Sequence, residues 1–200
     1  MTAKTVILAS GSQSRRSMLN GAGVSFTAVA PDLDEAAITK RMLRDGSGGS
    51  DVAMALAEAK ARAIAAGHPG ALVIGSDQVL VCGDSLLSKA VDSKGARETL
   101  TLLRGREHRL ISAAVIVEDG TIRWSGSDSA KLTMRAFSDA FLEVYLNREL
   151  PGILGSVGCY RIEGLGAQLF SRVEGDQFCV RGLPLFALLE ALRTHGALEA

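Results

Sequence analysis

The stretch Val6-Ile-Leu-Ala-Ser-Gly-Ser-Gln-Ser-Arg-Arg-Ser-Met-Leu19 decides the fold of this 200-residue chain. It opens with an apolar, β-favouring run that ends at Ala9, and small or polar residues follow up to the pair Arg15-Arg16. We interpret this order as a strand, a loop and the beginning of a helix. Such a turn directs backbone N–H groups and the positive end of the helix dipole at one point above the loop.

Two guanidinium groups at this point favour an anion as the ligand. Arg15 and Arg16 would supply planar, bidentate donors that match phosphate oxygens, so the segment indicates a polyphosphate site. The plainer interpretation is an ordinary loop and a solvated helix face, because neither a Walker motif nor a GxGxxG pattern is present. Both interpretations stay open on this segment alone.

Composition limits the classes of protein to which the chain can belong. It is 47% hydrophobic and 22% charged, which is typical of one globular domain over residues 1–200. The 22 basic and 22 acidic residues balance, which argues against a broad nucleic-acid-binding face. Three widely spaced cysteines without a CxxC pattern favour free thiols over disulfides or zinc ligands. With no signal peptide and no apolar run of about 18 residues, we expect a soluble cytoplasmic protein without membrane contact.

Two further segments carry acidic groups of interest. Pro31-Asp-Leu-Asp-Glu35 places three carboxylates within four residues, as either a surface loop or a site for a hard cation such as Mg²⁺. Leu72-Val-Ile-Gly-Ser-Asp-Gln-Val-Leu-Val81 predicts a buried strand that contains Asp77. Because an unpaired buried carboxylate is costly, Asp77 is expected to be functional, as a general base or a metal ligand.

The remaining segments predict alternating helices and strands. Ser50 is expected to cap a helix that runs to about Ala66 and carries Lys60, after a mobile connection over residues 40–49. Asp119-Gly120 is a hairpin signal. The other expected elements are a strand at 26–30, a helix at 93–103, strands at 108–118 and 131–136, a helix from Ser138 to Leu146, strands within 155–180 and a closing helix that begins near Pro184.

Taken in order, these segments resemble the Maf family of nucleoside triphosphate pyrophosphatases, over nearly the whole chain. The matching pieces are Leu8-Ala-Ser-Gly-Ser-x-x-Arg-Arg16, Asp34-Glu35, Lys60-Ala61, Ile74-Gly-Ser-Asp-Gln78, Lys89, Gly105-Arg-Glu-His108, Glu163-Gly-Leu-Gly166, Val173-Glu-Gly-Asp176 and Gly182-Leu-Pro-Leu185. The resemblance implies an elongated α/β fold, also shared with inosine-triphosphate pyrophosphatases, in which a central mixed sheet is flanked by helices and a cleft separates two lobes. It further implies hydrolysis of a nucleoside triphosphate to the monophosphate and pyrophosphate, a divalent cation (Mg²⁺ or Mn²⁺) and frequently a homodimer.

The resemblance also implies roles for individual residues. Asp77 would be the general base, and Glu35 and Asp77 would hold the metal. The residues expected to bind the triphosphate are Ser10, Arg15, Arg16, Lys60 and Lys89. The loop departs from the family pattern, since Gln13-Ser14 replaces a Ser-Pro pair and Ser88 and Ala90 flank Lys89.

Three positions bear on the choice of base, namely Ser14, Gln78 and Glu163. The segment Ser76-Asp-Gln78 together with Glu163 resembles the branch that is associated with 7-methyl-GTP, whereas Ser14 stands where that branch tends to carry an aromatic residue. Because neighbouring residues of a strand point to opposite faces, a bulge at Gly75-Ser76 is expected to turn Gln78 to the side of Asp77. The main alternative function is a nucleotide-binding regulator of cell division with weak turnover; the inosine-triphosphate pyrophosphatase family is a poorer match at Ala9-Ser-Gly-Ser12.

Overall fold

The computed structural model describes residues 4–199, which divide into two compact units. The first unit comprises the described residues up to Gln78, the segment Ser112–Asp128 and the described residues from Gly182 onward. The second comprises Val79–Ile111 and Ser129–Arg181. Each unit is therefore assembled from segments that are far apart in the chain.

Seven strands form one mixed sheet. They are β1 (Val6–Ala9), β2 (Thr27–Ala28), β3 (Leu72–Cys82), β4 (Ser85–Leu87), β5 (Glu107–Glu118), β6 (Thr121–Met134) and β7 (Phe170–Glu174). Their order is β2-β1-β3-β5-β6-β7, with β4 paired to β3. β1 is parallel to β2 and β3, whereas the pairs β3/β4 and β6/β7 are antiparallel. The predicted α/β fold with a central mixed sheet is confirmed.

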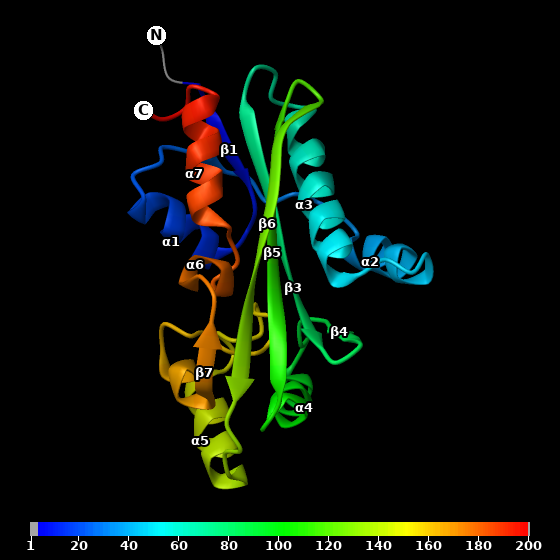
Figure 1. Cartoon of the computed structure of the whole chain (residues 1–200), viewed down its shortest axis with the longest axis vertical. Helices are drawn as coiled ribbons and strands as arrows, with labels where there is room; N and C mark the ends of the chain where they lie inside the picture. Colours follow the sequence, from blue (N-terminus) through cyan, green and yellow to red (C-terminus); the bar gives the residue numbers. More distant parts are fainter. Residues whose placement is uncertain (1–3, 200) are drawn as a thin grey trace. The chain divides into compact units, whose positions relative to one another are not determined.

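In the first unit the sheet is covered on both faces. Its helices are α1 (Gln13–Gly21), α2 (Glu35–Arg44), α3 (Gly49–Ala65) and α7 (Leu185–Thr194). Figure 1 shows α1 and α7 on one face of the strands and α3 on the other. β1, which lies between two parallel neighbours, is buried along its whole length, and this explains why its sequence is uninterrupted and apolar. The loop that follows β1 is thus attached to a rigid, buried strand.

The second unit has its own hydrophobic core. Its helices are α4 (Ser93–Leu103), α5 (Asp139–Glu149), the 3₁₀ helix η1 (Leu165–Leu169) and the short α6 (Gln177–Val180). Leu100, Leu132 and Tyr145 are completely or almost completely buried in this core. The three cysteines of the chain lie buried in the same core as free thiols, as the sequence predicts.

The largest difference from the predicted elements is α2. Residues 31–35 and 40–49 are expected to form loops, but Glu35–Arg44 is helical. Asp34 begins the helix, because its side chain accepts a hydrogen bond from the backbone N–H of Ala37 at 2.9 Å. No residue of α2 is fully buried, but Ile38 and Met42 lie one helical turn apart and are partly buried. The interpretation of this segment as loop overlooked that spacing and followed its charged and glycine-rich composition.

Other boundaries also differ. Gly48, rather than Ser50, caps α3, because the Asp51 side chain accepts the Gly48 N–H at 3.1 Å. The predicted strands within 155–180 are wrong apart from β7, since turns, η1 and α6 fill most of this range. The turn at Asp119-Gly120 joins β5 to β6 as predicted. No helix within residues 4–199 is both long and apolar enough to cross a membrane.

Candidate functional site

The loop between β1 and α1 has the predicted geometry. Ser12 caps α1, and its hydroxyl accepts the backbone N–H of Arg15 at 3.4 Å. The hydroxyl of Ser10 accepts the backbone N–H of Ser12 at 3.2 Å. Both interactions follow from the preference of serine for positions just before a helix, where its side chain can satisfy backbone donors that the helix leaves unpaired. The loop thus places two hydroxyls and a helix N-terminus together.

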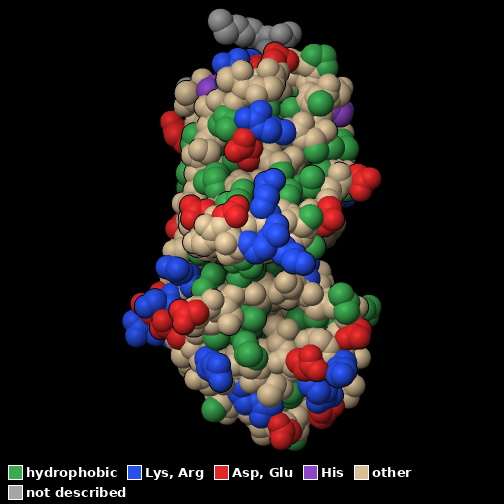
Figure 2. Space-filling model, turned by 90° about the vertical axis from the view of Figure 1, so that its right-hand side faces the viewer, with side chains coloured by type: hydrophobic (Ala, Val, Ile, Leu, Met, Phe, Trp, Pro, Cys, Tyr) green, Lys and Arg blue, Asp and Glu red, His purple; other side chains and the backbone are tan. Residues whose placement is uncertain are grey.

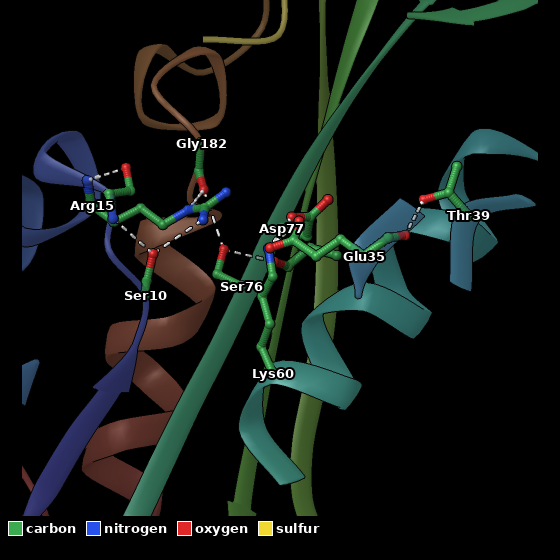
Figure 3. Close-up of polar contacts among 10 residues, drawn as sticks. Ser10, Arg15, Glu35, Thr39, Lys60, Ser76, Asp77 and Gly182 are labelled. Carbon is green, nitrogen blue, oxygen red and sulfur yellow. Dashed lines mark hydrogen bonds and ion pairs between the residues drawn. The ribbon is translucent and has the colours of Figure 1, made fainter. Parts of the chain in front are cut away.

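Arg15 and Arg16 are adjacent in sequence but have different surroundings. The Arg15 side chain is buried; its Nε donates to the carbonyl oxygen of Gly182 at 2.8 Å and its Nη1 to Ser10 Oγ at 3.3 Å (Figure 3). Burial lowers the pKa of the Arg15 guanidinium, and the nearby charges of Asp77 and Glu35 oppose that shift. Arg16 is half-buried and reaches the Ser10 carbonyl with Nη2 at 3.5 Å.

Asp77 forms an ion pair in the structure. The Nζ of Lys60, on α3, lies 2.6 Å from Asp77 Oδ1 and 2.9 Å from Glu35 Oε2 (Figure 3). The side chains of Lys60 and Asp77 are almost fully buried, whereas that of Glu35, at the first position of α2, is 44% exposed. Three of the predicted site residues therefore meet at one ammonium group, from β3, α2 and α3.

The close contact between α3 and β3 depends on Gly75. A Cβ at this position would lie 2.0 Å from the carbonyl oxygen of Ala57 and 2.6 Å from the backbone nitrogen of Ala61. The helix backbone thus occupies the space that any other side chain would need, and Lys60 is carried to within reach of Asp77. Sequence reasoning missed this role of Gly75, although a glycine inside an apolar strand run indicates a close backbone approach.

The two residues that flank Asp77 lie beside Gly182 instead. Ser76 Oγ donates to the Ala113 carbonyl at 2.8 Å and lies 3.2 Å from that of Gly182. The Gln78 amide donates to Ser112 Oγ at 3.1 Å, and its oxygen would be 3.8 Å from a Cβ on Gly182. β3 thus keeps its regular alternation, and the predicted bulge that turns Gln78 to the side of Asp77 is wrong.

Gly182 links the β1–α1 loop to the sheet. Its carbonyl oxygen accepts from Arg15 and Ser76, and its backbone φ is +104°, a conformation that residues with a side chain rarely adopt. In Figure 3 this glycine lies with Ser10 and Arg15 on one side of β3, and Lys60 and Glu35 lie on the other. Sequence reasoning gave Gly182 and Ser76 no individual role in the site, since the contact between them joins residues that are 106 positions apart.

Lys89 and Glu163 belong to the second unit and are exposed. Lys89 follows β4, in the segment that leads to α4. Glu163 lies in the turns before η1, with Oε1 3.8 Å from Nε of Arg181. The structure thus places Arg181 beside Glu163, a contact for which the sequence offers no local signal.

Carboxylate oxygens are the ligands that a divalent cation such as Mg²⁺ prefers. Within residues 4–199 there is no group of three or more His, Cys, Asp or Glu side chains that could hold a metal ion. Asp77 and Glu35 are nevertheless brought to the same ammonium group, and Mg²⁺ in phosphate-binding sites commonly uses one or two carboxylates together with substrate oxygens and waters. The two carboxylates thus fit a cation that binds together with a polyphosphate.

The chain was compared with known proteins. Residues 5–195 match the family described as Maf-like protein. A nucleoside triphosphate pyrophosphatase of Rhodospirillum rubrum is 50% identical over 193 residues, which cover 96% of each chain. A 7-methyl-GTP pyrophosphatase of Mesorhizobium japonicum is 47% identical over 199 residues and covers 100% of each chain. A nucleoside triphosphate pyrophosphatase of Caulobacter vibrioides is 46% identical over 198 residues and covers 99% of each.

Proposed function

The chain belongs to the Maf-like protein family, and from this premise we propose that it hydrolyses nucleoside triphosphates to the monophosphate and pyrophosphate. The observation that carries the proposal is the buried carboxylate of Asp77, which forms an ion pair with Lys60. Asp77 lies on β3, the strand that pairs with β1, and β1 leads into the loop before α1. A carboxylate on a rigid strand, next to a helix N-terminus with two arginines, combines a base with a phosphate site. We treat the whole chain as one catalytic domain of two units.

In the proposed reaction, Asp77 orients a water molecule and accepts its proton as the water oxygen attacks the α-phosphorus. The bond from that phosphorus to the bridging oxygen then breaks, and pyrophosphate leaves. Lys60 and Arg16 would donate to phosphate oxygens, where negative charge grows in the transition state, and the Ser10 hydroxyl would donate to one more. Lys89 is proposed to contact the triphosphate as well.

A divalent cation is part of this proposal. Glu35 and Asp77 would hold it, because their carboxylates already approach one common position at Lys60 Nζ. When bound, Mg²⁺ or Mn²⁺ would neutralise phosphate charge and polarise the phosphorus–oxygen bonds.

Arg15 has a supporting role in this proposal, since its guanidinium connects the loop between β1 and α1 to Gly182.

For the base we propose a modified purine, with 7-methyl-GTP as the leading candidate. The relative in Mesorhizobium japonicum and a second one in Rhizobium meliloti, 44% identical, bear the name 7-methyl-GTP pyrophosphatase. Glu163 and Gln78 are the proposed readers of the base, because a carboxylate accepts from the N1–H and amino donors of guanine. Arg181 and Ser14 would modulate this choice; Arg181 does so by sharing the charge of Glu163.

The proposed setting is the cytoplasm, with a homodimer as the proposed assembly and without nucleic acid as a partner. Formal net charge is zero. Figure 2 views the face that α2 and α3 present, and basic side chains there lie next to acidic ones. Such a mixed surface favours a small phosphate ligand over a long nucleic-acid chain.

The experiment that tests the function is a substrate panel. Purified protein is incubated with the common nucleoside triphosphates and 7-methyl-GTP, each with Mg²⁺ or Mn²⁺, and pyrophosphate and monophosphate are measured together. Equal amounts of both products are expected, with a higher kcat/KM for 7-methyl-GTP than for GTP. Release of orthophosphate and the nucleoside diphosphate instead would refute cleavage at the α-phosphorus. Tight nucleotide binding with no product would favour the nucleotide-binding regulator of cell division.

A further inference from the structure

Lys60 occupies a position that a divalent cation would also seek. Its ammonium group is within 3 Å of one oxygen of Asp77 and one of Glu35, and these two carboxylates come from different elements, β3 and α2. Figure 3 shows the lysine rising from α3 between them. In this state the ammonium group of Lys60 bridges the two carboxylates that would bind the metal.

We propose that Lys60 acts as an internal cation that reserves the metal position and leaves it when a divalent ion binds. An ammonium and a divalent ion cannot both contact the same two carboxylate oxygens at bonding distance, because of their size and their like charge. Lysine suits such an exchange, since its compact charge sits on a flexible four-carbon stem. This inference rests on the proposed cation site at Asp77 and Glu35, and on the proposed phosphate contact for where the ammonium goes next.

The burial of the lysine determines the energetics of the exchange. The Lys60 side chain is 6% exposed, so moving its ammonium away from both carboxylates without a new anion would leave a buried, unpaired charge. A triphosphate would provide that anion. Cation and triphosphate should therefore bind cooperatively, and the coupling must be equal in both directions. Without nucleotide, the ammonium group of Lys60 should remain bound to the two carboxylates, and the cation should bind weakly.

The same arrangement gives Glu35 a specific task. Asp77 is fixed on a central strand, whereas Glu35 is half-exposed at the start of α2, a helix with no buried residue. The bond to Lys60 ties this peripheral helix to the buried site before any ligand arrives. Lys60 is thus a positioning residue for the second carboxylate, in addition to its proposed contact with phosphate.

The test measures metal binding without substrate. Mn²⁺ alone is titrated into the wild type and into Lys60→Met, and free Mn²⁺ is followed by electron paramagnetic resonance. We expect at least tenfold tighter binding by Lys60→Met. Lys60→Arg, which keeps a positive charge, should bind as weakly as the wild type. Lys94→Met, at an exposed lysine of α4, is the control for a general change in net charge. Binding by Lys60→Met that is equal to the wild type, or weaker, would overturn the proposal.

A second measurement follows the wild type itself and needs a variant only to assign one signal. Lysine side chains are labelled with ¹³C at Cε, and the Lys60 signal is assigned by its loss in Lys60→Arg. Saturating Mg²⁺ should shift that signal and leave Lys94 unchanged, since the ion displaces the ammonium from Asp77 and Glu35. An unmoved Lys60 signal at saturation refutes the exchange. Neither measurement involves turnover, so a protein that hydrolyses no nucleotide would refute the proposed function and leave this inference to its own result.

Discussion

Asp77 in the first unit and His108 in the second are both ionisable and buried, but only one of them meets an opposite charge. Asp77 is 6% exposed and forms an ion pair with Lys60 at 2.6 Å. His108 is 2% exposed; its Nε2 is hydrogen-bonded to the neutral hydroxyl of Tyr160 at 2.7 Å, and its Nδ1 has no hydrogen-bond partner within residues 4–199.

The missing charge partner of His108 determines its protonation state and its role. Burial without a charge partner lowers the pKa of His108 from 6.5 to about 4, so its imidazole is neutral at pH 7. Its ring packs with Tyr160 and Phe170, and it belongs to the core. In this protein the buried carboxylate that meets a counter-charge is placed for chemistry, whereas the buried imidazole that meets none packs in the core.

The largest effect is expected for Asp77→Asn. This change keeps the shape of the side chain and removes its capacity to accept a proton, so kcat should fall by roughly 10²–10⁴, while nucleotide affinity stays within about tenfold. Steady-state kinetics and binding of a non-hydrolysable analogue measure the two quantities. Asp84→Asn, at an exposed acid in the β3–β4 turn, is the matched control. Turnover near that of the wild type would remove Asp77 from its role.

Gly75→Ala should disturb the same site through packing. The new methyl group would overlap the carbonyl oxygen of Ala57, so α3 must move away from β3 and take Lys60 with it. We expect the free energy of unfolding to fall by about 3 kcal/mol or more, measured by urea denaturation. Gly21→Ala, on α1 with open space around its Cβ, should be neutral or slightly stabilising. Equal changes in the free energy of unfolding for the two variants would show that α3 can move away from β3 without loss of stability.

His108→Gln should change how stability depends on pH. The pKa of His108 is lower in the folded state, so the unfolded chain binds more protons between pH 6.5 and about 4. This histidine therefore removes up to about 3 kcal/mol of stability as the pH falls through that window. Unfolding curves at pH 7 and pH 4.5 should show a smaller difference in the variant. Tyr160→Phe, which keeps the buried imidazole, should retain most of the wild-type difference; loss of that difference would assign the shift to the hydrogen bond instead.

Arg15 and Arg16 extend the comparison to adjacent residues. Arg15→Lys should weaken the tie to Gly182 and lower the stability of the apo protein, because lysine cannot reproduce its two directed hydrogen bonds. Arg16→Ala should leave stability within about 0.5 kcal/mol and weaken triphosphate binding by about 1.5–3 kcal/mol, the usual contribution of a charge-assisted hydrogen bond. Thermal unfolding and titration calorimetry separate the two effects. The opposite pattern would make Arg15 the phosphate ligand and Arg16 the structural residue.

The smallest effect concerns Glu163, whose ion pair with Arg181 is partly exposed. Glu163→Gln replaces an acceptor by a donor, so kcat/KM for guanine nucleotides should fall roughly ten- to a hundredfold, equivalent to about 1–3 kcal/mol. Pyrimidine triphosphates should be affected less. An equal loss on both substrate classes would show that Glu163 serves folding or the metal rather than the base, and no change on either would exclude it from the site.

Much of the scaffold could be predicted from sequence because its signals are local. The apolar run before Ala9, the helix that begins near Arg15 and the turn at Asp119-Gly120 each depend on residues close together in the chain, and each is present as predicted. Asp77 was identified in the same way, since a carboxylate within an apolar run needs a partner. The helix α2 was missed because its acidic start and charged, glycine-rich end were interpreted as loops, although Ile38 and Met42 have helical spacing.

The identity of each partner was decided by tertiary structure alone. Nothing in the sequence says that Asp77 would meet Lys60, or that Arg15 would donate to Gly182, which is 167 residues away. These contacts arise where separate segments pack against one sheet, at a distance set by details such as the missing side chain of Gly75. The physical reason is that burial makes a charge require a partner, whereas the sequence encodes only the need, and the packing of distant segments selects the group that meets it.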